Sequence, residues 1–327
     1  MKLTKTTLAL TLSSLFALPT FAEDKVENPE FIDFYGKLNI AIQSSDEKGE
    51  TSNDLKSNAS RVGVKGGYKL DHGLTAIYKL EWQVNVNDDS KDSLTARSQW
   101  VGIKGDFGQL TVGRDDTPLK VSQGKFDLFN DYAGDLKYLF VGENRVTDSI
   151  TYKSPDFNNF RVLASYIIGT DENDDDPYSF GVQWGDGTLK KTKFFVSASH
   201  DSNMPGKKSI YDTTRLVGMY KMGDLRLGGI LTTSEITKYD TDPSFVGESE
   251  NGYAVNASYK LGKFLTKVQY QEFADADAIN FGVDYKLGKN TKVFAWYTDR
   301  EGLDFNGQTV KAAEKGTYMA IGMEQKF

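Results

Sequence analysis

Apolar and polar residues alternate along much of the chain with a period of two, which is the pattern of β-strands whose two faces meet different surroundings. From residue 74 to 84, one face carries the apolar side chains Leu74, Ala76, Tyr78, Leu80, Trp82 and Val84. The other face carries the polar side chains Thr75, Lys79, Glu81 and Gln83. Residues 253–261 and 279–287 alternate in the same way. No segment after residue 22 has a comparably long helical period, so the pattern predicts an all-β fold.

Sixteen segments carry the signal of a strand. They lie near residues 31–43, 60–70, 74–85, 95–104, 108–113, 147–153, 160–167, 178–184, 192–200, 213–221, 225–235, 252–260, 264–271, 278–287, 291–300 and 317–327. The fourth and fifth alternate poorly. The mean hydropathy of -0.48 fits a soluble secreted protein and also a membrane β-barrel, because barrel strands alternate lipid-facing apolar residues with lumen-facing polar ones.

The connections between these segments alternate in length. Short ones lie at residues 71–73, 105–107, 185–187, 222–224, 261–263 and 288–290, and longer polar ones at 44–59, 201–212, 236–251 and 301–316. Such sorting is typical of an outer-membrane barrel, which has short periplasmic turns and long external loops. The last segment ends on Phe327 and is expected to pair with the first, because a closed barrel leaves no strand edge.

Aromatic residues recur near the ends of the predicted strands. They are Tyr68, Trp82, Trp100, Tyr152, Tyr166, Trp184, Tyr220, Tyr259, Tyr270 and Tyr285. Rings at these levels would form the interfacial girdles of a membrane barrel. Ordinary β-propensity explains any single ring equally well, but the recurrence of rings together with the alternation favours girdles.

The first 22 residues have the layout of a secretory signal peptide. Lys2 and Lys5 precede an uncharged and mostly apolar stretch from Thr6 to Leu18, and a short segment with small residues before the cleavage point ends at Ala22. The apolar run is too short for a helix that spans a bilayer, which takes about 20 residues. We therefore expect residues 1–22 to be cleaved and residues 23–327 to form the barrel.

The composition excludes several kinds of chemistry. The chain has no cysteine, which rules out disulfides and thiolate metal sites. The formal net charge of -7 becomes -9 when the two lysines of the signal peptide leave, so nucleic-acid binding is disfavoured and a weak preference for cations is suggested. Residues 171–176 form an acidic run, but it lacks the glycine at position six of a calcium loop, and Val182 stands at position twelve.

No pattern of catalytic residues is evident. The two histidines, His72 and His200, are far apart in sequence, and neither has an evident partner that would make it a catalytic base. We therefore expect neither enzyme activity nor a bound metal or cofactor.

At this level of detail the chain resembles the general, non-specific trimeric porins of Gram-negative bacteria. The residues that carry the resemblance are Phe34–Leu38, Ser60–Gly66, Leu110–Arg114, Asn144-Arg145 before Asp148–Tyr152, and the terminal Phe327. The resemblance implies sixteen antiparallel strands, a homotrimer in contact with outer-membrane lipid and lipopolysaccharide, and a third external loop folded into the lumen. It implies passive diffusion of small hydrophilic solutes across the outer membrane.

The longest connection, residues 115–146, is the expected third loop, and long loops without regular structure are usually functional. The resemblance places acidic loop residues opposite a row of cations on the barrel wall. The loop candidates are Asp127, Asp131 and Asp135, and the wall candidates are Lys37, Arg61, Arg97, Arg114 and Arg145.

Residues two apart on a strand point to the same face, and this parity tests the wall candidates. Lys37, Arg61 and Arg145 have the parity of polar, lumen-facing neighbours, whereas Arg97 lies on a poorly alternating strand. Arg114 has the parity of the apolar Leu110 and Val112, so it reaches the lumen only if the chain bends there. For each arginine the alternative is a solvated lumen residue without a special role.

Other functions stay open at this point. A substrate-selective porin for oligosaccharides or an anion would line its path with particular side chains, to which Tyr35, Tyr132 and Tyr138 are candidate contributors. A barrel enzyme, or an adhesin or phage receptor acting through its loops, is a more distant alternative.

Overall fold

The computed structural model describes residues 30–47, 49–87, 93–169, 176–206, 209–239, 246–301 and 315–327. The expected signal peptide, and residues 171–175 of the acidic run, lie outside this part of the chain. Among the described residues, no helix is both long and apolar enough to cross a membrane.

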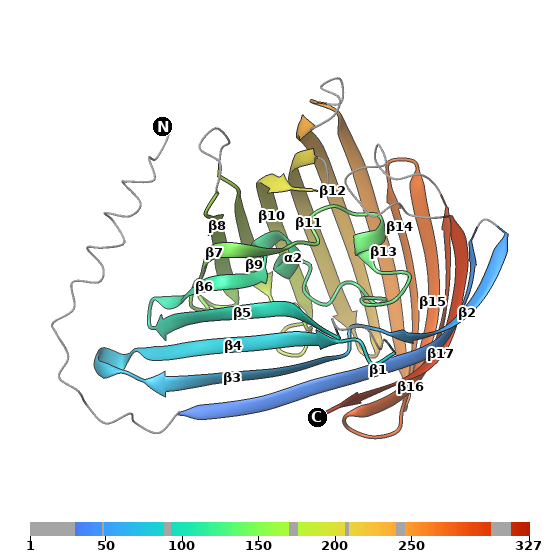
Figure 1. Cartoon of the computed structure of the whole chain (residues 1–327), viewed down its shortest axis with the longest axis horizontal. Helices are drawn as coiled ribbons and strands as arrows, with labels where there is room; N and C mark the ends of the chain where they lie inside the picture. The colour runs from blue at the N-terminus through green and yellow to red at the C-terminus, as the bar shows by residue number, and fades with distance from the viewer. Residues whose placement is uncertain are drawn as a thin grey trace.

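Seventeen strands form one antiparallel sheet that closes on itself (Figure 1). They are β1 (Phe31–Glu47), β2 (Glu50–Ser57), β3 (Arg61–Lys69), β4 (Thr75–Val84), β5 (Leu94–Gly105), β6 (Gly108–Asp116), β7 (Arg145–Lys153), β8 (Phe160–Ile167), β9 (Tyr178–Gly185), β10 (Phe194–Pro205), β11 (Ser209–Met222), β12 (Leu225–Tyr239), β13 (Ser249–Leu261), β14 (Phe264–Phe273), β15 (Ala276–Lys286), β16 (Thr291–Glu301) and β17 (Gly316–Lys326).

β2 and β3 are two halves of one interrupted strand. β1 pairs with β3 along its first half and with β2 along its second half, and a short break at residues 58–60 separates the two partners. On its other edge, β1 pairs with β17 from Lys37↔Lys326 to Glu47↔Gly316. The barrel therefore has sixteen positions around its circumference, which confirms the predicted sixteen-stranded antiparallel barrel.

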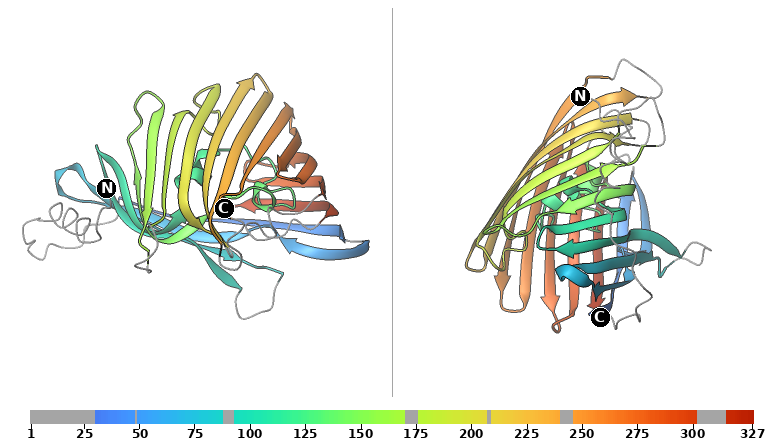
Figure 2. Two further views of the ribbon diagram at one scale, coloured as in Figure 1. Left: turned by 90° about the horizontal axis from the view of Figure 1, so that it is seen from above. Right: turned by 90° about the vertical axis from the view of Figure 1, so that its left-hand side faces the viewer.

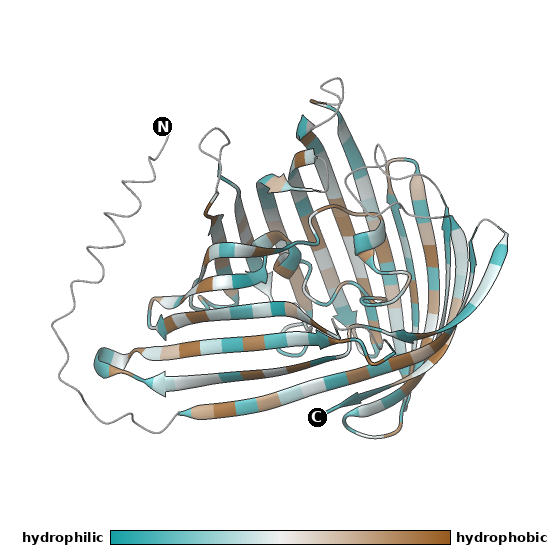
Figure 3. Cartoon of the chain, viewed as in Figure 1, coloured by the Kyte–Doolittle hydropathy of each residue, from teal (hydrophilic) through white to brown (hydrophobic). Residues whose placement is uncertain are grey.

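The two faces of the barrel wall differ in polarity, as the alternating bands of Figure 3 show. On β11, Leu216 and Tyr220 are exposed on the outside, whereas Arg215 and Val217 are buried on the inside. Exposed apolar side chains recur at every second position on the neighbouring strands. In lipid, a closed barrel satisfies all backbone hydrogen bonds internally and presents only apolar side chains outward.

Aromatic pairs lie at two levels of the outer surface. Near the short turns, the ring centroids of Phe264 and Tyr285 are 4.7 Å apart. Near the opposite end, those of Tyr253 and Tyr270 are 5.9 Å apart. The prediction for Trp100 was wrong, because it is the register partner of Lys79 and shares its inner face. The poor alternation of β5 gave no parity signal for this residue.

Two of the expected external loops, residues 44–59 and 201–212, are mostly strand, and strands also extend into both ends of residues 236–251. β1 ends at Glu47 and β2 begins at Glu50. β10 ends at Pro205 and β11 begins at Ser209, and β12 ends at Tyr239 and β13 begins at Ser249. Where the barrel rises beyond the lipid, both faces meet water, so alternation disappears although the hydrogen-bonded ladder continues. Residues 302–314 of the fourth expected loop lie outside the described residues.

The connection between β6 and β7 folds back inside the barrel (Figures 1 and 2). It contains helix α2 (Pro118–Ser122), which begins after Thr117, whose hydroxyl accepts a hydrogen bond from the Lys120 amide at 3.3 Å. A second turn, η2 (Leu136–Tyr138), begins after Asp135, whose carboxylate accepts from the Lys137 amide at 2.9 Å. We call residues 117–144 the inner loop.

Apolar side chains attach the inner loop to the inner wall in two clusters. In the first, Phe126, Leu136 and Phe140 pack against wall residues such as Phe195 and Phe273. In the second, the loop residues Phe129, Tyr132 and Ala133 pack against Phe294, Trp296 and Tyr318. Burying a side chain of this size contributes roughly 1.5–3 kcal/mol, so the inner loop belongs to the folded core.

A glycine of the wall makes room for one of these contacts. A Cβ atom at Gly228 would lie 2.9 Å from the ring of Phe126, whereas one at the adjacent Gly229 would meet no atom within 4 Å. The two glycines therefore offer a matched pair on the two faces of β12.

We expect Gly228→Val to displace Phe126 and loosen the inner loop, at a cost of about 1–3 kcal/mol for overpacking. Gly229→Val serves as the control, because its side chain points to lipid from the same strand. The measurement is the thermal unfolding midpoint in detergent, together with the rate of tryptic cleavage after Lys125 and Lys137. Equal behaviour of the two variants would show that the inner loop does not depend on this contact.

Candidate functional site

Two of the cavities inside the barrel lie on opposite sides of the inner loop. The turn-side cavity, of about 640 Å³, reaches the short-turn end of the wall and is lined there by Lys153, Arg161 and Thr188. The loop-side cavity, of about 680 Å³, opens between the long ends of β1 and β2 and is lined by residues such as Gln43 and Asp54. The lining residues that the two cavities share are Ala59, Gln83, Asp131 and Lys137. These four residues therefore lie where the two cavities meet, and we call this place the constriction.

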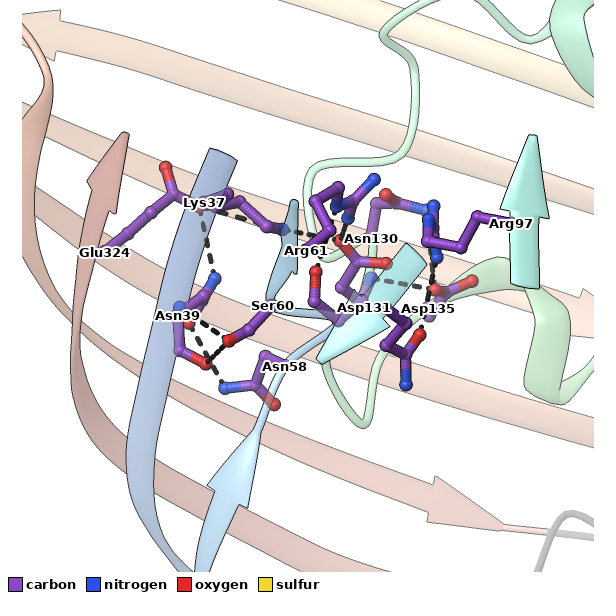
Figure 4. A network of polar contacts seen from close by, with 12 residues as sticks. Lys37, Asn39, Asn58, Ser60, Arg61, Arg97, Asn130, Asp131, Asp135 and Glu324 are labelled. Atoms are coloured by element: carbon purple, nitrogen blue, oxygen red, sulfur yellow. Dashed lines mark hydrogen bonds and ion pairs between the residues drawn. The ribbon is translucent and has the colours of Figure 1, made fainter. Parts of the chain in front are cut away.

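Asp131 is the centre of the charge arrangement at the constriction (Figure 4). Its Oδ2 lies 2.8 Å from Nζ of Lys37 on β1 and 2.7 Å from a guanidinium nitrogen of Arg61 on β3. Lys37 and Arg61 are direct register partners, so neighbouring strands deliver both cations to the same point of the wall. Burial alone would raise the pKa of Asp131, but the two adjacent cations hold it below its ordinary value.

The backbone on each side fixes this contact. At the break between β2 and β3, the carbonyl of Ala59 accepts a hydrogen bond from Nε of Arg61 at 3.0 Å. On the loop, Asp131 has a left-handed backbone with φ 74, and its amide donates to Asp135 at 2.8 Å. Aspartate is among the residues that tolerate this conformation best. Asp131 is thus held at the tip of a turn, with its carboxylate aimed at the wall.

A second carboxylate belongs to the wall itself. Glu81 on β4 accepts from Nε of Arg97 at 2.7 Å and from the Tyr35 hydroxyl at 2.9 Å, and Nζ of Lys79 lies 3.6 Å away. Sequence reasoning missed Glu81 as a partner for Arg97. Its inward parity with Lys79 and Gln83 was the available signal.

A third arrangement lies at the root of the inner loop. Asp116, the last residue of β6, lies 2.9 Å from Arg145 and 3.2 Å from Lys120. Arg145 lines the turn-side cavity. Three carboxylates, at positions 131, 81 and 116, therefore each meet two cations of the wall or loop.

The other two loop carboxylates support the loop from within. Asp127 accepts hydrogen bonds from the amides of Phe129 and Leu136 and from the side chain of Gln269, at 2.9, 3.1 and 3.1 Å. Asp135 is only 2 % exposed and bonds to the Asp131 and Lys137 amides. Burial raises the pKa of Asp127, and the charge of Asp135 adds to that effect. The carboxylates of Asp127 and Asp135 therefore face the loop backbone more than the passage.

Arg114 stands apart from the other wall candidates. It is the register partner of Gln99, and a register shift between Gly113 and Asp115 follows at once on the β7 side. Its Nε is buried and has no hydrogen-bond partner among the described residues. It is not one of the residues that line the two cavities.

Buried wall side chains attach the inner loop along its length. Arg215 is fully buried and bonds to Glu143 at 2.6 Å and to the Val141 carbonyl at 2.7 Å. The Lys267 ammonium donates to the Leu128 carbonyl at 3.2 Å, and the Asn256 amide to the Phe126 carbonyl at 2.6 Å. Sequence reasoning missed these residues. Their inward parity was visible, but nothing in the sequence says which carbonyl each one meets.

We expect Arg215→Met to destabilise the protein by about 3–5 kcal/mol, because Glu143 and the Val141 carbonyl would stay buried without their donor. Arg161→Met is the control. It removes an arginine whose pair with Asp156, at 3.0 Å, is partly exposed and is worth about 0–1 kcal/mol. Chemical denaturation followed by tryptophan fluorescence measures both variants, and similar losses would contradict the attachment described above.

Within the described ranges, no group of three or more histidine, aspartate or glutamate side chains is arranged to hold a metal ion. His200 lies on β10, where its Nδ1 is 2.9 Å from the Thr214 hydroxyl. It shares the outward parity of Val196 rather than the lumen.

Comparison with known proteins adds independent information. A family model described as Gram-negative porin matches residues 7–304. A monosaccharide porin of a Halomonas species is 26% identical over 276 residues, covering 77% of this chain and 74% of that protein. The major outer membrane protein P.IB of Neisseria sicca is 24% identical and covers 99% of both chains.

Two solved structures share the fold. OmpF of Salmonella typhi, solved with daunomycin, superposes with a TM-score of 0.71 at 15% identity, covering 90% of this chain and 97% of that one. OmpT of Vibrio cholerae in its trimer form superposes with a TM-score of 0.69 at 20% identity, covering 91% and 99%.

Proposed function

The chain belongs to the Gram-negative porin family of outer-membrane proteins, and from this premise we propose that it forms a water-filled channel for the passive diffusion of small hydrophilic solutes and ions. The observation that carries the proposal is the junction of the two cavities beside the ion pairs of Asp131 with Lys37 and Arg61. A channel needs a narrow point and a pattern of charge there, and no nucleophile or base.

The constriction sorts solutes by polarity in this proposal. The Asp131 carboxylate forms contact ion pairs with Lys37 and Arg61 at the edge of the passage, and the dipoles of these pairs set up a field beside the path. A polar solute can align with such a field and keep its interactions with water and with the charged side chains. An apolar solute gains nothing from the field and must displace bound water, so it crosses more slowly.

The cavity lining favours a weak preference for anions. The turn-side cavity is lined by eight cations, Arg61, Arg97, Lys120, Lys125, Lys137, Arg145, Lys153 and Arg161, and by six acids, Asp116, Asp127, Asp131, Asp135, Glu143 and Asp186. Each acid is already engaged by cations or by hydrogen-bond donors, whereas Lys125 and Lys153 form no ion pair within the described part of the chain. The preference differs from the weak cation preference that the net charge suggests, because local charges decide selectivity.

The proposed assembly is a homotrimer in the outer membrane. The Vibrio cholerae neighbour is described in a trimer form, and its coverage of this chain is nearly complete. The exposed apolar residues of the outer wall would contact lipid, lipopolysaccharide or a neighbouring subunit.

A saccharide-selective porin is the second candidate, favoured by one observation. Tyr138 and Tyr318 line the loop-side cavity on either side of Arg300, whose guanidinium lies 4.6 Å and 4.9 Å from their ring centroids. Tyr132 also lines this cavity, and its ring packs on Phe294 with ring centroids 5.0 Å apart. Saturable block of ion current by one sugar, lost in Tyr138→Ala, would favour this candidate over a general channel.

Purified protein in a planar bilayer should give stepwise conductance, in multiples of three for a trimer. We expect Asp131→Asn to raise the permeability ratio of chloride to potassium about two- to five-fold, because Lys37 and Arg61 lose the charge that neutralises them. The measurement is the reversal potential in a KCl gradient.

Asp277→Asn is the control, because Asp277 shares its outer-face parity with Ile279 and lies at the end of β15 away from the constriction. Its reversal potential should match that of the unmodified protein. A folded, inserted protein without conductance would refute the channel. Conductance with an unchanged reversal potential in Asp131→Asn would refute the role of Asp131 alone.

A further inference from the structure

Positive charge collects at one end of the barrel. The turn end comprises the seven short connections, two strand residues on each side of them, and the start of β1 and the end of β17. Its described cations are Lys69, Lys104, Lys153, Arg161, Lys190, Lys191, Lys193, Lys221, Arg226, Lys260, Lys263, Lys286, Lys289, Lys292 and Lys326. Its described acids are Glu30, Asp71, Asp106, Asp156, Asp186 and Asp224. Cations thus outnumber acids by more than two to one.

The opposite end has the reverse balance. The loop end comprises the connections at the opposite end of the barrel and two strand residues on each side of them, without the inner loop and its flanks. Its described acids are Asp46, Glu47, Glu50, Asp176, Glu248, Glu250, Glu272, Asp275, Asp277 and Glu301. The described cations there are Lys238, Arg300 and Lys315. The charges of the barrel are therefore separated along its axis.

Part of this separation faces the lumen. On the inner face at the turn end, Lys221 is the register partner of Arg226, and Lys286 is that of Lys292. On the other side, Lys104 and Lys153 flank Gln109 in one row across β5, β6 and β7. At the loop end, Glu47 and Glu50 are partners on the inner face of β1 and β2.

Like charges placed directly opposite each other destabilise a sheet unless something screens them. Asp284 already pairs with Lys292 at 2.9 Å. For the other like-charge partners, mobile counter-ions of a water-filled lumen can provide the screening, anions beside the lysines and cations beside the glutamates. The two mouths would then hold different mobile ions, separated by the constriction at Asp131.

We propose that this axial charge separation makes the channel rectify ionic current, conducting better when the loop side is positive. The inference rests on the proposed channel function and adds a direction to it. With the loop side positive, cations from the loop mouth and anions from the turn mouth both move toward the constriction, so carriers accumulate there. With the opposite sign, both kinds of carrier leave the constriction and the current falls.

The same arrangement predicts which class of small solute collects at each mouth of the channel. Small anions gather at the turn mouth and small cations at the loop mouth. The effect requires a Debye length comparable with the lumen, which is about 10 Å at 0.1 M salt and about 3 Å at 1 M. Rectification should therefore be strong in dilute salt and absent in concentrated salt.

The test is a current–voltage curve from a bilayer in which the orientation of the protein is known. The chain has no cysteine, so Thr188→Cys, which lies in the β9–β10 turn and lines the turn-side cavity, gives a unique thiol. A maleimide-polyethylene glycol too large to pass the channel should lower the current only when it is added on the turn side, which identifies that side.

In 0.1 M KCl we expect the current at +100 mV on the loop side to exceed that at -100 mV roughly two-fold, and the ratio to approach one in 3 M KCl. The double variant Lys104→Gln and Lys153→Gln should lower this current ratio. The double variant Glu47→Gln and Glu50→Gln should lower it as well. Glu272→Gln with Asp277→Asn removes two charges from the outer face and should change it least.

The outcomes separate the two proposals. Stepwise conductance with a symmetric curve in 0.1 M KCl would overturn rectification and leave the channel function intact. A ratio that survives in 3 M KCl, or that responds equally to the outer-face control, would also overturn it. Folded, inserted protein that passes no current at either sign would instead refute the channel function.

Discussion

The pairing of β1 with β17 is the interaction on which the rest of the structure depends. It joins the two ends of the sheet, from Lys37↔Lys326 to Glu47↔Gly316, and so removes the exposed strand edges that lipid cannot hydrate. Closure also creates an inside. Only because the sheet is closed do the polar faces of all its strands look toward one another, and only then can the inner loop be buried by the wall around it.

The inner loop fills part of the barrel interior and, in the proposed channel, sets its narrow point. Its aromatic side chains occupy one side of the lumen, and Arg215, Lys267 and Asn256 hold its backbone from the wall. The remaining space is lined by Arg61 on β3, Gln83 on β4 and Arg97 on β5, among others. Position and charge of the passage thus follow from one packing arrangement: apolar contacts fill one side and leave the charged side wet.

Much of the fold could be predicted from the sequence, because a lipid–water difference across the wall imposes a period of two. All sixteen strand positions were predicted, although the alternation was weak at β5 and β6. The signal failed where the difference vanishes, which is why the ends of β1 and β2 beyond Ser44 read as a loop. It also failed for Trp100, where the alternation itself is weak.

The site was less accessible to sequence reasoning. Parity placed Lys37 and Arg61 on the inner face, and the structure brings both to Asp131. Parity cannot distinguish a loop carboxylate that faces the passage from one that caps its own backbone. Asp127, Asp131 and Asp135 look alike in sequence, yet two of them bond to loop amides. That distinction depends on the loop conformation, which has no repeating pattern.

β1 takes part in both the closure of the sheet and the charge of the passage, because Lys37 stands in the ladder with β17 and beside Arg61 in the ladder with β3. A slip of one residue in either seam would turn its side chain from water to lipid. A barrel closed in the wrong register would therefore place the Lys37 ammonium in hydrocarbon and lose its ion pair with Asp131 at the same time. For the proposed channel, one error of register would therefore disturb both assembly and transport.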